Sequence, residues 1–232
     1  MLLHIITKQL KIGLIKHYEA IAKETSLPII LYNVPSRTGL NILPKTCFEL
    51  SKIDNIVAIK EASGNISQVA EIANICKDDL HIYSGNDDQI LPVLSLGGLG
   101  VISVLSNIAP KKASLITKNF FSGNIKDSIS MQLEALPLIQ ALFCEVNPIP
   151  VKMALNLMGY NFGSPRLPLI DLSSSKIDLL YSFLLDTFSN TFNSSAFFII
   201  LDIIISFCLF NLLSSLIAVS YTHLRAHETC AD

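Results

Sequence analysis

Short, almost wholly apolar runs alternate with helical segments through the first half of this 232-residue chain. The apolar runs occupy residues 27–34, 55–62, 80–87 and 98–106. Strands this apolar are buried on both faces, and strands that alternate with helices form βαβ units around a parallel sheet. The alternation therefore predicts an α/β fold, in which the helices cover residues 14–25, 43–53, 67–77 and 88–96.

The apolar runs stop after residue 106, and only helical patterns follow them. Hydrophobic spacing predicts helices over residues 110–121, 125–143, 148–158 and 175–188. We therefore divide this part of the chain into an α/β unit over residues 14–106 and a helical domain over residues 107–188.

Charge and cysteine content exclude several classes of partner. The net charge is −2, so no basic surface for nucleic acid is expected. The five cysteines are an odd number at scattered spacings, which favours neither a disulfide framework nor a zinc site. We expect reduced, buried thiols in a cytoplasmic protein.

The end of the chain, residues 189–232, differs in composition from the rest. Residues 196–219 are mostly Phe, Ile and Leu, a length that matches a membrane-spanning helix, although Asp202 and Asn211 interrupt it. We interpret 189–232 as a spurious extension and expect no membrane partner. A tail anchor and an apolar tail packed on a partner are the alternatives.

Three side chains near strand ends suggest carbonyl chemistry. Lys60 ends an apolar run, where burial favours a neutral, nucleophilic amine that can form a Schiff base. Tyr32 ends the preceding run, and Arg37 follows it; a phenol can shuttle protons, and a guanidinium can clamp a carboxylate. The alternatives are a Lys60 that snorkels to solvent or pairs with Glu61, a solvated Tyr32 hydroxyl and a solvated loop arginine.

Two glycine-bearing turns stand at the later predicted strands: residues 84–87 end the third run, and residues 97–100 begin the fourth. Neither matches a nucleotide-binding glycine loop. Gly85 and the backbone near Ile102 can approach a small ligand closely, and turn formation alone is the alternative.

Five motifs together resemble the dihydrodipicolinate synthase family of class I pyruvate aldolases, over roughly residues 12–186. They are YNVPSRTG (32–39), IKEASGN (59–65), YSGND (83–87), GGLGVISV (97–104) and NPIPVKMAL (147–155). The resemblance implies a (β/α)8 barrel with a C-terminal helical domain. It also implies a lyase that condenses pyruvate with aspartate semialdehyde in lysine and diaminopimelate biosynthesis, usually a homotetramer, with no metal or organic cofactor.

The same resemblance implies roles for individual residues. Lys60 would form the Schiff base with pyruvate, and Tyr32 would relay protons. Arg37 would bind the carboxylate of aspartate semialdehyde. The pyruvate pocket would be lined by Gly85, Asn86 and the backbone of Ile102.

The chain also departs from the family. We expect it to hold only strands five to eight of the barrel, to lack the early threonine pair, and to be inactive alone. We interpret residues 1–13 as a frameshifted segment. Two alternatives remain for function: a sialic acid lyase-like or keto-acid aldolase relative, and a catalytically dead, membrane-tethered remnant that binds a full-length subunit.

Overall fold

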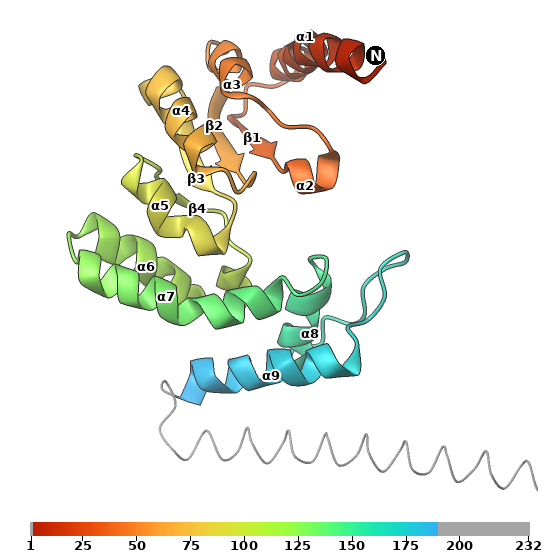
Figure 1. Ribbon diagram of the computed structural model, residues 1–232, viewed down its shortest axis with the longest axis vertical. Coiled ribbons are helices and arrows are strands. Elements are labelled where there is room, and N and C mark those ends of the chain that lie inside the picture. The colour runs from red at the N-terminus through yellow and green to blue at the C-terminus, as the bar shows by residue number, and fades with distance from the viewer. Residues whose placement is uncertain (1, 190–232) are drawn as a thin grey trace, which may run out of the picture.

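The computed structural model describes residues 2–189 and contains one parallel sheet (Figure 1). Its strands follow chain order and are β1 (Ile29–Asn33), β2 (Ile56–Glu61), β3 (His81–Ser84) and β4 (Gly100–Val101). The neighbouring strands are all parallel. The predicted α/β class, with four strands in the first half of the chain, is confirmed.

The fourth strand is much shorter than the predicted run over residues 98–106. Strand β4 itself holds two residues, Gly100 and Val101, which are the register partners of Tyr83 and Ser84, and the chain then reaches the 3₁₀ turn η3 (Leu105–Asn107). The buried carboxylate of Asp87 accepts hydrogen bonds from the backbone N–H groups of Val104 and Leu105, each at 2.9 Å. These bonds bend the chain out of the sheet, so apolar character alone overestimated the strand.

Helices connect the strands, and those other than the short α2 pack on one face of the sheet. They are α1 (Leu2–Lys23), α2 (Pro35–Thr38), α3 (Pro44–Leu50), α4 (Ile66–Cys76) and α5 (Ile90–Ser95), with the 3₁₀ turns η1 (Lys77–Asp79) and η2 (Asp87–Gln89). The covered face presents alternate strand residues, among them Leu31, Ile59 and Ile82, to α3 and α4.

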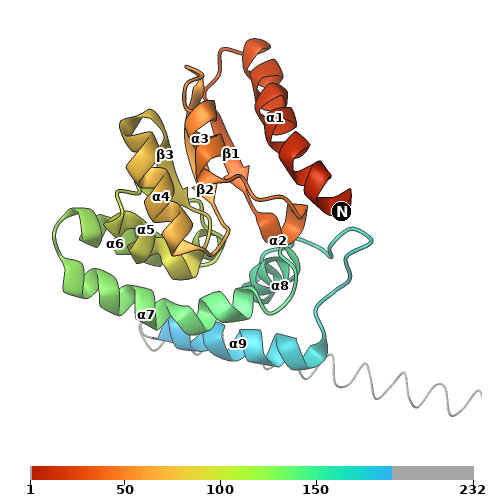
Figure 2. The same cartoon turned by 45° about the horizontal axis from the view of Figure 1, so that its top comes forward.

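The first helix begins earlier than predicted. α1 runs without interruption through residue 13, whereas the sequence pattern predicts a helix only from residue 14. Leu14, Ile15 and Tyr18 pack against the hydrophobic cluster on the covered face, which includes Leu31, Ile59 and Ile82 and is called the sheet cluster below. α1 lies beside α3 and β1 in both views (Figures 1 and 2). The frameshift interpretation concerns the coding sequence and stays a prediction.

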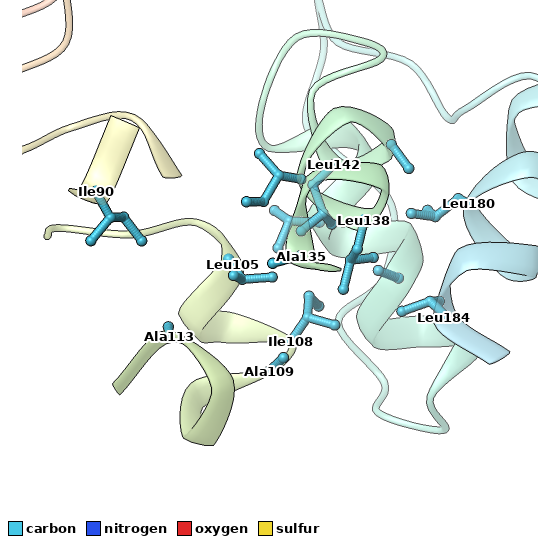
Figure 3. Packing of buried hydrophobic residues seen from close by; sticks show 14 of the residues in the cluster. Ile90, Leu105, Ile108, Ala109, Ala113, Ala135, Leu138, Leu142, Leu180 and Leu184 are labelled. Carbon is cyan, nitrogen blue, oxygen red and sulfur yellow. The ribbon is translucent and has the colours of Figure 1, made fainter. Parts of the chain in front are cut away.

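The helical region lies against the end of the α/β unit (Figure 2). It consists of α6 (Pro110–Phe121), α7 (Ile125–Leu142), α8 (Ile149–Leu157) and α9 (Ser174–Ser189), and each bound lies within one residue of the prediction. Its core joins Leu138 and Leu142 of α7 to Leu180 and Leu184 of α9, with Ile90 of α5 also in the cluster (Figure 3).

Among residues 2–189, no helix combines the length and the apolar character that crossing a bilayer requires. The tail prediction over residues 189–232, including the candidate span over 196–219, falls almost wholly outside the described part of the chain.

Candidate functional site

Lys60 and Tyr32 lie side by side on neighbouring strands. They are register partners between β1 and β2, and the Lys60 Nζ atom stands 4.2 Å from the centroid of the Tyr32 ring. Tyr32 is 46% exposed, so this face of the sheet is open at the pair. Parallel pairing, which aligns the carboxyl ends of adjacent strands, brings the predicted amine and phenol together.

The alternative in which Lys60 pairs with Glu61 is wrong. Successive side chains of a strand point to opposite faces, and Glu61 is 3% exposed on the face that the helices cover. Its carboxylate accepts hydrogen bonds from Asn33. The ion pairs Lys52–Glu49 and Lys176–Glu145 do not involve Lys60.

The backbone of Gly85 lies so close to Ala62 and to the Lys60 side chain that no side chain fits at position 85. A Cβ atom at this position would meet Ala62 Cβ at 2.6 Å and Lys60 Cε at 3.2 Å. The Gly85 N–H also donates to the Glu61 carbonyl oxygen at 2.7 Å. Glycine at position 85 therefore leaves room for the Lys60 side chain. This steric requirement constrains the residue type more than the formation of a turn does.

The other two residues of the predicted pyruvate pocket, Ile102 and Asn86, make different contacts. Ile102 donates its backbone N–H to Ser84 O at 2.9 Å, which continues the β3–β4 pairing by one bond. Asn86 instead turns its amide toward Gln89, at 3.4 Å. It lines a cavity of about 310 Å³ between η2 and α7, whose lining includes neither Lys60 nor Tyr32.

Arg37 lies on the exposed helix α2, directly after β1. Its Nη1 donates to the backbone oxygen of Asn147 at 3.0 Å, which links two segments 110 residues apart. The arginine therefore has a structural partner in the helical region. The roles of all six predicted residues in binding or catalysis remain predictions.

Sequence patterns alone did not identify a polar cluster behind the sheet. It consists of the buried residues Asn33, Glu61 and Gln68 and the half-buried Asn41, joined by side-chain hydrogen bonds. Glu61 in a strand whose other residues are largely buried was the available signal, since a buried carboxylate requires partners.

The three cysteines in the described part of the chain do not contribute a nucleophile to this site. Cys47 and Cys76 are free and buried, as expected, whereas Cys144 is half-buried. Burial raises the pKa of Cys76 to about 11 and also raises the pKa of Cys47. Both thiols are thus protonated at neutral pH, and the thiolate is the reactive form.

The geometry suits condensation of an amine with a carbonyl compound. Lys60 offers a primary amine at the open end of a strand, and the Tyr32 ring beneath it carries a hydroxyl group that can exchange protons. The rigid strands hold both groups, which is the arrangement that covalent catalysis needs.

Residues 6–184 match the sequence model of the dihydrodipicolinate synthetase family. The chain is 59% identical over 174 residues to the 4-hydroxy-tetrahydrodipicolinate synthase of Caldicellulosiruptor saccharolyticus, covering 75% of this chain and 59% of that protein. A second 4-hydroxy-tetrahydrodipicolinate synthase, from Lachnoclostridium phytofermentans, is 59% identical over 169 residues, or 72% of this chain and 58% of that protein. The chain thus spans about 59% of the length of these relatives.

Solved structures of dihydrodipicolinate synthases are also similar to this chain. The dihydrodipicolinate synthase of Thermotoga maritima superposes with a TM-score of 0.74 at 43% identity, over 76% of this chain and 61% of that one. The chloride-inhibited enzyme of Acinetobacter baumannii, solved in complex with pyruvate, superposes with a TM-score of 0.73 at 38% identity, over 76% of this chain and 60% of that one. The predicted fold class, a partial (β/α)8 barrel followed by a helical domain, is confirmed by these neighbours.

Proposed function

Since this chain belongs to the dihydrodipicolinate synthetase family, we propose that it carries the pyruvate-activating site of a Schiff-base lyase. The observation that carries the proposal is the position of Lys60 Nζ, 4.2 Å above the ring of Tyr32 at the open ends of β1 and β2. The full reaction would condense pyruvate with aspartate semialdehyde to 4-hydroxy-tetrahydrodipicolinate.

The first half of this reaction needs only an amine and a proton carrier. The Lys60 amine attacks the keto carbon of pyruvate, and the hydroxyl group of the resulting carbinolamine leaves as water with a proton from the Tyr32 hydroxyl, which gives a protonated imine. The Tyr32 oxygen, which gave up its proton in that step, takes a proton from the methyl group, and the imine becomes an enamine. The enamine carbon then attacks the aldehyde carbon of the second substrate, and a proton returns to the new alkoxide.

The second substrate would bind beside α2. Arg37 is exposed there and directs one guanidinium nitrogen to Asn147 O, so its remaining N–H groups are suited to a carboxylate.

We extend the proposal to the family's homo-oligomeric assembly and to the cytoplasm. The free thiols support a reducing compartment.

Reductive trapping tests the half-reaction directly. The chain is incubated with pyruvate and borohydride, and peptide mass mapping locates the adduct. We expect the adduct on Lys60, none in Lys60→Ala, and normal trapping in the control Lys52→Ala, which removes an exposed lysine. Arg37→Ala should still trap pyruvate, because we assign Arg37 to the second substrate. An adduct that persists in Lys60→Ala would refute the proposal.

A further inference from the structure

Glu61, the residue after the lysine, is a buried carboxylate whose partners are all neutral. The Asn33 amide nitrogen lies 3.1 Å from Oε1 and 2.9 Å from Oε2. The backbone N–H of Ser63 donates to Oε1 at 2.6 Å, and Gln68 Nε2 donates to Oε2 at 3.2 Å. Polar groups held this way inside a fold fix the orientation of the segments that carry them.

The hydrogen bonds continue into a closed network. Asn33 Oδ1 accepts from the backbone N–H of Ile42 at 2.9 Å, and Asn33 Nδ2 lies 2.8 Å from Asn41 Oδ1. Asn41 and Gln68 exchange a reciprocal pair of amide hydrogen bonds, at 2.8 and 3.0 Å. The network therefore joins the ends of β1 and β2 to the loop after α2 and to the first turn of α4.

This network lies directly behind the candidate site. Asn33 and Glu61 are register partners, and the pair next to them is Tyr32 and Lys60. Lys60 and Glu61 are consecutive residues of β2, so their side chains point to opposite faces of the same strand. A rotation of the backbone at Glu61 would therefore also reorient the Lys60 side chain.

We propose that Glu61 and Asn33 are positioning residues, whose contact on the covered face holds the Lys60 amine over the Tyr32 ring on the open face. The inference rests on the proposed function of Lys60, since positioning matters only if that amine reacts. It assigns a function to Glu61 that does not require contact with any substrate.

The network also provides its own rescue variant. In Glu61→Gln, the new amide places a donor against the Asn33 donor, and in Asn33→Asp two carboxylates face each other. In the double variant Asn33→Asp/Glu61→Gln, the donor and the acceptor are exchanged. If the Asn41 and Gln68 amides both flip, the hydrogen bonds among these side chains reverse direction and are kept, except the bond between residue 33 and Oε1 of residue 61, where two oxygens then meet because Oε1 still accepts from Ser63 N–H.

The experiment compares four proteins: the unaltered chain, Glu61→Gln, the double variant and Ile72→Val. Ile72 is fully buried on α4, so its substitution lowers stability without touching the network. Each protein is characterised by its unfolding midpoint and by its rate of pyruvate trapping at saturating pyruvate. We expect Glu61→Gln to trap roughly 10- to 100-fold more slowly, the double variant to recover to within about threefold, and Ile72→Val to trap normally.

The outcomes separate this inference from the proposed function. If Glu61→Gln traps pyruvate as fast as Ile72→Val, the positioning role is overturned. If the unaltered chain traps no pyruvate, the proposed function fails, and reductive methylation of Lys60 with formaldehyde, relative to the exposed Lys52, tests positioning instead. The positioning role is supported if Lys60 is methylated faster in Glu61→Gln than in the other three proteins. It is overturned if Lys60 is methylated at the same rate in all four.

Discussion

At the scale of single residues, Gly85 determines how much room the lysine has. The 2.6 Å approach to Ala62 Cβ that any side chain would make cannot be relieved without moving the end of β2. We expect Gly85→Ala to slow pyruvate trapping by at least about tenfold and to destabilise the fold by about 1–3 kcal/mol. The control is Gly100→Ala, whose Cβ would meet Tyr83 at an ordinary 3.5 Å. Equal trapping by the two variants would contradict this reasoning.

At the scale of elements, Asp87 decides where β4 ends and η3 begins. Its buried carboxylate accepts from the N–H groups of Val104 and Leu105, and truncation would leave both donors unsatisfied. We expect Asp87→Ala to lower the free energy of unfolding by about 2–4 kcal/mol in urea denaturation. The neighbouring Asp88 is exposed, and Asp88→Ala should change stability by less than about 0.5 kcal/mol. A small effect at both positions would show that the carboxylate does not hold η3.

At the scale of the whole molecule, α5 connects two hydrophobic clusters. Val93 packs in the sheet cluster, whereas Ile90 and Leu94 pack in the cluster of the helical region that contains Leu138 and Leu180. We therefore expect residues 2–189 to unfold in one transition, and Leu138→Ala in α7 to shift that transition as a unit, by about 2–5 kcal/mol. Leu133→Ala on the exposed side of the same helix should have little effect, since Leu133 is 58% exposed. Separate transitions for the α/β unit and the helical region would rule out this coupling.

The candidate site shows which residues a sequence pattern can identify. Lys60 and Tyr32 could be predicted together, because apolar runs mark strands and parallel strands place their carboxyl ends at one edge. Arg37 could be named but not its bond to Asn147, since nothing local relates residues 110 positions apart. Asn86 could likewise be named but not the orientation of its side chain, whose amide nitrogen lies 3.4 Å from Gln89 Oε1.

The sequence by itself determined the α/β class, the bounds of the four later helices to within one residue, and the choice of Lys60 as the candidate nucleophile, because hydrophobic period and residue chemistry are local properties. Only the tertiary structure decided that β4 ends after two residues and that Glu61 bonds Asn33 and Gln68 rather than Lys60. Each of these depends on donors and acceptors brought together from distant parts of the chain. Buried polar groups must find partners wherever the fold supplies them, and their spacing in the sequence carries no record of which partner that will be.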